Sequence, residues 1–534
     1  MSVTHRAFQT ASLSLSISCA FSSGCGDPSA GDVDDEIGSE STEDTLGTEE
    51  TGSSSDSDST ETDSDSDSDS DSSDSDSTDS DSSETGDENL DCSIEGAFQY
   101  APPATEIDGL FATPIDILAT EATIFFSLGS QHAIAEVSVD FRVGPEGGMP
   151  IFDLRQTIDA GTFDQQFIDP AAAQRHDFGK GLDYGFRILE FELEPCTEHT
   201  LTLQYALDVP DAPEAGGLEW STAPNRLYFD SWLSDLNPGR YLESWLPANL
   251  PFDRQALTLY LVLEDAGVPH TLLSNAEIEE FSEHDWKLEF PDTTTAMAPL
   301  IIVVPSEQIS ASTGVHQAAN AQDIPYTLVR HETAGESLTS LEARLLDAID
   351  EFVTSTGDFL HPAMLGYVSA SARSMEYDGG FTTKPSDLEH EAFHSWWARG
   401  VHPATYADGW IDEAWDMYNT TLGLSFTVEP FDWDDAPTEL YDAHPFARDT
   451  PNASYWTGRA VFAGLAAIMG VDELRAAMAT LYADIEPLGS VSTELLERHL
   501  YCESGEQLEV LQAFWRFVRG FDGSVPEPAA DLCD

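Results

Sequence analysis

The change in hydrophobic period near Pro305 constrains the fold more than any other feature of the sequence. Before this proline, apolar and polar residues alternate in short runs, for example at 122–127, 135–141, 201–205 and 256–263. Such alternation predicts antiparallel β-strands. After it, helical spacing predicts helices at 338–354, 387–399, 409–420, 454–469, 472–481, 492–501 and 507–519, entered through strands near 365–368 and 375–382. We therefore predict a multidomain α+β protein, with a β domain at 92–305 and a mainly helical domain at 306–534.

Residues 25–91 are rich in Ser, Asp, Glu, Thr and Gly, and residues 63–70 alternate strictly between Asp and Ser. This composition cannot bury a core, so the segment is predicted to be a disordered acidic linker kept extended by charge repulsion. Calcium binding by the Ser-Asp repeats is an alternative, without the glycine pattern of known calcium loops. The whole chain has a formal net charge of -78, which disfavours nucleic acid and anionic membrane surfaces as partners.

The first 24 residues have the layout of a signal peptide: Arg6 is followed by an apolar run and then by small residues before Cys25. The small residues resemble a lipobox, which implies lipidation of Cys25 and cleavage before it, although Ser22 stands where Leu is usual. Ordinary signal-peptidase cleavage nearby remains an alternative. The resemblance predicts an exported protein, lipid-anchored to a bacterial membrane or cell surface.

Four cysteines remain after Cys19 in the leader and Cys25: Cys92, Cys196, Cys502 and Cys533. In an exported protein they suggest two disulfides. Three connectivities are open, and the pairing Cys92–Cys196 with Cys502–Cys533 keeps each bridge inside one predicted domain. Their spacing does not fit a cysteine zinc site.

The motif His390-Glu391-Ala-Phe-His394 contains the candidate catalytic residues. Ser386 and Glu389 form a capping-box pattern, so a helix is predicted to begin just before His390. Residues four apart lie on one helical face, which places both imidazoles where they can bind one zinc ion. Glu391 lies about 100° round the helix, off the metal but able to take a proton from a metal-bound water.

Glu413 supplies the third ligand in this interpretation, with eighteen residues between it and His394. Two histidines, one glutamate and an open water position are the ligand set of a catalytic zinc site, with one zinc per chain. Nearby aromatic residues, such as Trp396 and Trp410, are interpreted as core packing that dries the site. Chance occurrence of the pentad on a surface helix is the alternative.

The spacing of His390, Glu391, His394 and Glu413 resembles the gluzincin zinc aminopeptidases typified by aminopeptidase N. The similarity extends over about 92–522, and the segments 241–247, 273–275 and 293–304 resemble landmarks of that family's N-terminal β-saddle domain. It implies a β-saddle domain followed by a thermolysin-like catalytic domain. The large C-terminal helical domain of longer members has no counterpart before the chain ends, which implies a more open cleft.

Two further site residues come from this resemblance. Tyr455 lies in a segment similar to the family's Tyr-x-Lys-Gly motif, which implies that its hydroxyl stabilises the oxyanion. Glu376 matches the glutamate of the Gly-x-Met-Glu-Asn motif, which implies that it binds the substrate's α-ammonium group. Arg373 and Tyr377 replace the glycine and asparagine of that motif, and no glutamine before Tyr241 fits the family's second amine anchor.

The resemblance implies a zinc-dependent peptidase that acts on peptide substrates and removes N-terminal residues. Two alternatives stay open at this point. One is a gluzincin endopeptidase with an open cleft, which would cut peptides with blocked N-termini equally well. The other is a non-catalytic surface binding protein that kept the fold, and the intact set of His390, Glu391, His394 and Glu413 argues against it.

Overall fold

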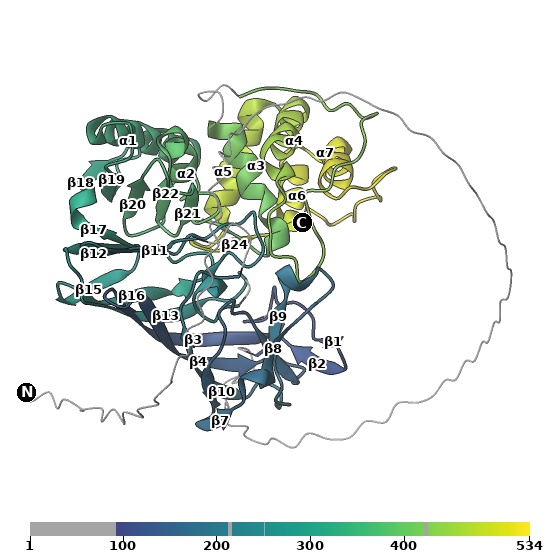
Figure 1. Cartoon of the computed structure of the whole chain (residues 1–534). Coiled ribbons are helices and arrows are strands. Elements are labelled where there is room, and N and C mark those ends of the chain that lie inside the picture. Colours follow the sequence, from purple (N-terminus) through teal and green to yellow (C-terminus); the bar gives the residue numbers. More distant parts are fainter. Residues whose placement is uncertain (1–91, 95, 212–215, 250, 421–425, 534) are drawn as a thin grey trace, which may run out of the picture. The chain divides into compact units, whose positions relative to one another are not determined.

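The computed structural model describes residues 92–94, 96–211, 216–249, 251–420 and 426–533 (Figure 1). The predicted signal peptide, the acidic linker and Cys25 lie outside these residues. Within them, no helix combines the length and apolar character needed to cross a membrane.

The largest sheet has eight strands, in the order β15-β16-β13-β3-β4-β10-β6-β7. Buried residues alternate with exposed ones along β4, as the sequence predicts. The prediction of an antiparallel domain is wrong at two pairs. Strand β13 reaches β3 through a long connection and lies parallel to it, and in a smaller sheet β2 (Leu110–Thr113) lies parallel to β5 (Met149–Phe152). The strands are β3 (Ile115–Ser127), β4 (His132–Val143), β6 (Ala160–Phe163), β7 (Gln166–Ile168), β10 (Glu198–Ala206), β13 (Gln255–Glu264), β15 (Glu277–Ser282) and β16 (Asp285–Thr294).

Two smaller sheets complete the first half of the fold, in the orders β1-β2-β5-β9-β8 and β11-β12-β17-β14. A hydrophobic core joins the eight-stranded sheet to the four-stranded one, with Phe126 and Phe229 in contact at its centre. The strands are β1 (Thr105–Ile107), β2 (Leu110–Thr113), β5 (Met149–Phe152), β8 (Ala173–His176), β9 (Phe186–Leu189), β11 (Leu218–Thr222), β12 (Asn225–Asp230), β14 (His270–Ser274) and β17 (Ile301–Pro305).

The second half begins with a five-stranded sheet, β18-β19-β20-β22-β21. Two of its strands, β18 and β19, are absent from the sequence prediction, because β18 has Ser, Thr, Gly and His at most positions and alternates weakly. Strand β21 is an edge strand that pairs with β22. The strands are β18 (Ile309–Gln317), β19 (Asp323–His331), β20 (Met364–Val368), β21 (Met375–Tyr377) and β22 (Gly380–Thr383). A short parallel pair, β23 (His402–Pro403) and β24 (Ser490–Val491), lies further along the chain.

Seven α-helices share one hydrophobic core in this half, and α3 to α7 lie together in Figure 1. Five of them match the predicted stretches closely, and the predicted helix at 507–519 is divided between α7 and a π-helical segment at Phe514–Val518. The predicted helix at 387–399 is too long, because α2 ends at Phe393 and the chain then turns sharply. The helices are α1 (Leu338–Ser355), α2 (Leu388–Phe393), α3 (Trp410–Thr420), α4 (Ala453–Met469), α5 (Val471–Asp484), α6 (Thr493–Glu503) and α7 (Leu508–Ala513).

The predicted capping box before His390 is also wrong. Asp387 occupies the N-cap position of α2, without a side-chain capping bond. The Glu389 carboxylate is engaged elsewhere, because both of its oxygens accept hydrogen bonds from the guanidinium of Arg344 on α1, at 2.7 and 2.5 Å. An arginine fork binds a carboxylate more strongly than a backbone N–H does.

The edge strand β21 is fastened to the first half of the fold on both sides. Before it, Arg373 donates to the hydroxyl of Ser234 at 2.6 Å. After it, the Asn275 amide donates to the carbonyl of Asp378 at 2.7 Å. Met375 and Tyr377 of β21 also lie in a core that both halves share. The position of β21 is therefore set by the first half as well as by its own sheet.

The structure contains both of the disulfides that keep each bridge within one half of the chain. Cys92 is bonded to Cys196, and Cys502 is bonded to Cys533. The first ties the beginning of the described chain to the start of β10, and the second ties the end of α6 to the last described residues.

Candidate active site

Helices α2 and α3 bring the three predicted metal ligands together. The Nε2 atoms of His390 and His394 lie 3.4 Å apart, and Glu413 Oε2 lies 3.5 and 3.7 Å from them. These three residues are the one group among the described residues whose donor atoms could share a metal ion. Glu413 Oε2 is buried and has no hydrogen-bond partner. A buried acceptor without a donor beside two imidazole nitrogens fits a cation, and a donor set of two nitrogens and one oxygen suits zinc.

The other nitrogen of each imidazole also has an acceptor. His390 Nδ1 lies 2.9 Å from Oδ1 of Asp416, and His394 Nδ1 lies 3.1 Å from the carbonyl oxygen of Trp397. Such contacts fix the ring orientation and leave Nε2 free for a metal. Sequence analysis missed Asp416, although its place three residues after Glu413 on α3 puts both on one helical face.

Glu391 is buried beside the three ligands, and its Oε2 has no hydrogen-bond partner. Burial is the largest cause of its raised pKa, the negative charges of Glu376 and Glu413 add to it, and His390 opposes them. A carboxyl group whose basicity is raised by burial is suited to accept and return a proton.

Tyr455, at the start of α4, reaches the same site. Its hydroxyl donates to Oε1 of Glu413 at 2.7 Å, and its ring lies nearly parallel to that of His390. Burial, followed by the charge of Glu413, raises the pKa of Tyr455 well above its usual value, so the hydroxyl keeps its proton. The approach of α4 to α3 depends on Gly458, because a Cβ there would lie 2.5 Å from Cβ of Ala414.

Glu376 lies on β21, where the structure gives it a partner that sequence analysis did not predict. Arg399 Nη2 donates to Oε1 of Glu376 at 2.8 Å, and the two side chains are 1% and 5% exposed. Arg399 follows His394 by five residues, which could have pointed to a place near the site. It was not predicted there, because it was assigned to a helix that ends earlier in the structure.

Two further buried carboxylates, Asp235 and Asp412, lie near Glu376 and were also missed. Burial is the main cause of the raised pKa of each, and the charges of Glu413 and Glu376 raise both further. Asp235 comes from the first half of the fold, six residues before Tyr241. Both halves of the chain therefore contribute acidic groups to this region.

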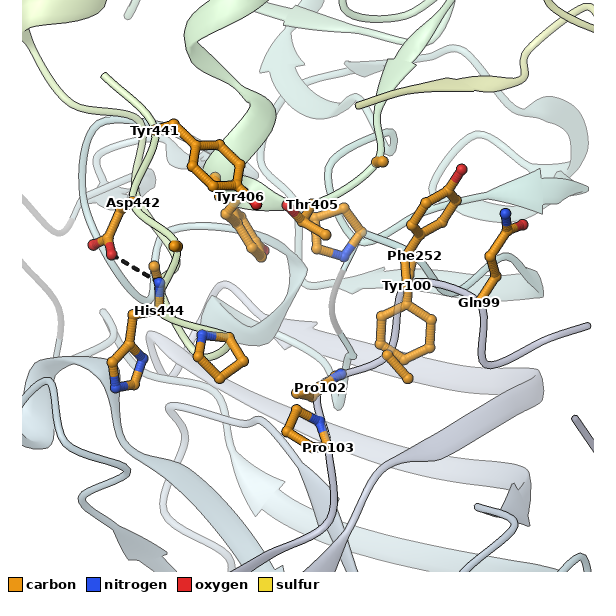
Figure 2. A pocket seen from close by; sticks show the side chains of 17 residues that line it. Gln99, Tyr100, Pro102, Pro103, Phe252, Thr405, Tyr406, Tyr441, Asp442 and His444 are labelled. Atoms are coloured by element: carbon orange, nitrogen blue, oxygen red, sulfur yellow. Dashed lines mark hydrogen bonds between the residues drawn. The ribbon is translucent and has the colours of Figure 1, made fainter. Parts of the chain in front are cut away.

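A separate cavity of about 280 Å³ contains none of these residues (Figure 2). Aromatic and proline side chains line most of it, including Tyr100, Phe252 and Tyr441. Asp442, on its wall, accepts a hydrogen bond from the backbone N–H of His444 at 3.0 Å.

The fold is that of the M1 zinc metallopeptidases. A mutant M1 zinc metallopeptidase from Deinococcus radiodurans, solved with the substrate Tyr-Ser-Ala, has a TM-score of 0.53 and 15% sequence identity, over 78% of this chain and 96% of that one. Aminopeptidase A from Legionella pneumophila, solved with aspartic acid, has a TM-score of 0.54 and 13% sequence identity, over 78% of this chain and 51% of that one. Leukotriene A4 hydrolase from Saccharomyces cerevisiae has a TM-score of 0.53 and 14% sequence identity, over 78% of this chain and 69% of that one.

No protein-family model and no curated protein matched the sequence. At the identities found, the solved structures establish the fold.

Proposed function

We propose that the chain is a zinc-dependent peptidase that removes N-terminal residues from peptides. The observation that carries this proposal is the convergence of His390, His394 and Glu413 on one point, with Glu391 buried beside them. When bound by these three residues, a zinc ion would polarise the scissile carbonyl and acidify a water molecule.

The residues around this point have separate roles in the proposed reaction. Glu391 accepts the proton of the attacking water and passes it to the leaving amine. The Tyr455 hydroxyl donates to the oxyanion that develops on the substrate carbonyl. Asp416 and the Trp397 carbonyl hold the two imidazoles in the orientation that presents Nε2.

Substrate binding is assigned to β21 and the acidic groups around it. An edge strand has unpaired backbone groups that can bind an extended peptide by strand addition. Glu376, in the middle of β21, then receives the α-ammonium group of that peptide. Asp235 contributes a second buried carboxyl group in the same region. The Deinococcus radiodurans relative, which was solved with a bound tripeptide substrate, supports a peptide as ligand.

The finer architecture is part of the same proposal. We assign residues 92–305 to a β-saddle domain and 306–534 to a thermolysin-like catalytic domain. The switch from the β-sheets ending at β17 to the sheet and helices that begin at β18 supports this boundary.

We also propose that residues 1–24 are a signal peptide and that lipid on Cys25 anchors the exported protein to a bacterial membrane. The leader pattern and the acidic linker at 25–91 support this proposal. Like-charge repulsion would extend the linker and hold the peptidase away from the membrane.

An endopeptidase is the second candidate function. It is favoured because no glutamine before Tyr241 fits the second amine anchor, which leaves Glu376 to bind the α-ammonium group without that partner.

Matched peptides with free and acetylated N-termini separate the two candidates. An aminopeptidase cleaves the free peptide and leaves the acetylated one intact, whereas equal cleavage shows an endopeptidase. Zinc content is measured in parallel on wild type and on His394→Ala and Glu413→Ala, which should lose metal and activity together. Full zinc occupancy in both variants would contradict the ligand assignment.

A further inference from the structure

Arg399 is a buried guanidinium group whose single side-chain partner of opposite charge at ion-pair distance, among the described residues, is Glu376. The Nη2–Oε1 distance is 2.8 Å, and Nε of Arg399 is buried without a hydrogen bond. Arginine is rarely fully buried unless it is paired, because desolvation of its charge is costly. The pair is therefore a specific contact between the segment after α2 and strand β21.

The backbone around Arg399 is held tightly to the metal-binding segment. Its N–H donates to the carbonyl of His394 at 3.0 Å. Ala398, just before it, has a φ of +106°, a conformation that residues other than glycine rarely adopt. Such strain persists only where surrounding contacts enforce it, and it is common at functional sites. The inward direction of Arg399 is thus enforced by the same turn that ends the helix of His390.

Acidic side chains surround the pair. Asp378 and Asp412 act on Arg399, and the charge of Glu376 acts on Asp235 and Asp412. Without a cation, the ionised form of Glu376 would be repelled by the ionised forms of Asp235 and Asp412, since like charges in a poorly solvated region interact strongly. Arg399 offsets that repulsion through one oxygen of Glu376 and leaves the other oxygen for a ligand.

We propose that Arg399 is a positioning residue that holds the Glu376 carboxylate where it receives the α-ammonium group of the substrate. This inference rests on the proposed function, because it assigns Arg399 a role in the amine recognition of the same site. Arg399 acts through Glu376 and does not touch the substrate. The ion pair then supports aminopeptidase activity and sets its preference for free N-termini.

Binding measurements test this role without hydrolysis. The probes are leucinamide and N-acetylleucinamide, titrated calorimetrically into the zinc-loaded protein. We expect wild type to bind leucinamide about ten-fold or more tighter than its acetylated form, as a contact between charged groups provides. Arg399→Met should bring this ratio close to one and leave the affinity for the acetylated form unchanged.

A double variant separates positioning from a general structural role. In the Glu376→Gln background the amine contact is already weakened, so adding Arg399→Met should lower the ratio no further. Arg330→Met is the control, because Arg330 is a half-buried arginine that donates to the backbone carbonyls of Ala334 and Glu336 and not to Glu376. The control should keep the wild-type ratio.

The inference would be overturned if Arg399→Met kept the wild-type ratio of leucinamide to N-acetylleucinamide affinity. It would also be overturned if the double variant lowered this ratio by the product of the two single-variant effects. A wild-type ratio of one would overturn it too. If Arg399→Met does not fold or loses zinc, Arg399→Lys carries the test, because lysine keeps the charge without the rigid fork. Positioning is supported if Arg399→Lys prefers leucinamide over N-acetylleucinamide less than wild type does, and if this difference disappears in the Glu376→Gln background. A preference equal to that of wild type overturns the inference.

Hydrolysis is assayed separately on peptides with free and acetylated N-termini. If wild type cleaves neither, the proposed function fails, whereas the binding ratio still decides the role of Arg399.

Discussion

Two carboxyl groups of the candidate site, Glu391 and Glu413, differ sharply in their affinity for protons. Burial raises the pKa of Glu391 well above its usual value. Glu413 is equally buried, but the neighbouring imidazoles of His390 and His394, together with the Tyr455 hydroxyl, lower its pKa to about 2. Glu413 is thus ionised as a ligand must be, whereas Glu391 is poised to bind a proton. Such divergence within one site supports the proposed roles of Glu391 as the base and Glu413 as a ligand.

Replacing Glu391 by Gln tests the assigned base. The amide keeps the size of the side chain but cannot accept the proton, so kcat should fall by about 10²-fold to 10⁴-fold. KM and zinc content should barely change, because Glu391 is not among the three ligands. Steady-state kinetics with metal analysis checks both, and a variant with wild-type kcat would exclude Glu391 as the base.

Asp416 offers a second prediction at this scale. Asp416→Ala removes the acceptor of His390 Nδ1, and loss of such a contact typically weakens zinc affinity about 10-fold to 100-fold. Asp416→Asn keeps a carbonyl acceptor and should lose less. Competition with a chromogenic chelator measures both affinities. Equal affinity of wild type and Asp416→Ala would show that the contact does not support the metal site.

At the scale of elements, the long helices and the strongly alternating strands could be predicted from the sequence, because burial imposes a clear hydrophobic period on both. The end of α2 could not be predicted. Trp396 and Trp397 continue the apolar pattern after Phe393, but they are buried in a turn and not on a helix. The convergence of His390, His394 and Glu413 could be predicted from their spacing in the sequence. Arg399, Asp235 and Asp412 could not, since their meeting with Glu376 depends on how distant segments pack.

The contact between α3 and α4 gives a prediction about packing. Gly458→Ala would place a methyl group 2.5 Å from Cβ of Ala414, so the helices that carry Glu413 and Tyr455 must separate. Overpacking of this kind costs about 1–3 kcal/mol of unfolding free energy. Denaturant unfolding measures the loss, and zinc affinity should fall with it.

The matched control is Gly335→Ala, because a Cβ at Gly335 meets no heavy atom within 4 Å. This variant should change stability by no more than about 0.5 kcal/mol. If both variants unfold at the same denaturant concentration, the close approach of α3 and α4 does not constrain the fold.

At the scale of the whole molecule, the folded residues and the leader make separable contributions. If lipid on Cys25 anchors the protein as proposed, Cys25→Ser should release it from the membrane fraction, because the serine side chain lacks the sulfur that would carry the lipid. Peptidase activity and zinc content should stay at wild-type values, since Cys25 lies outside the described fold. Fractionation followed by immunoblotting checks the release. Membrane retention equal to that of wild type would contradict the lipid anchor.

Strand β21 is held from the first half of the fold by Ser234 and Asn275, whereas the three candidate metal ligands lie on α2, directly after α2 and on α3, in the second half. In the proposed reaction, the distance from Glu376 to those ligands determines how many residues separate the amino end of a peptide from the bond that is cut. The packing between the halves would therefore act as a molecular ruler. Loosening it at Asn275 would change the length of the released product, from single amino acids toward dipeptides, before it changed the chemical step.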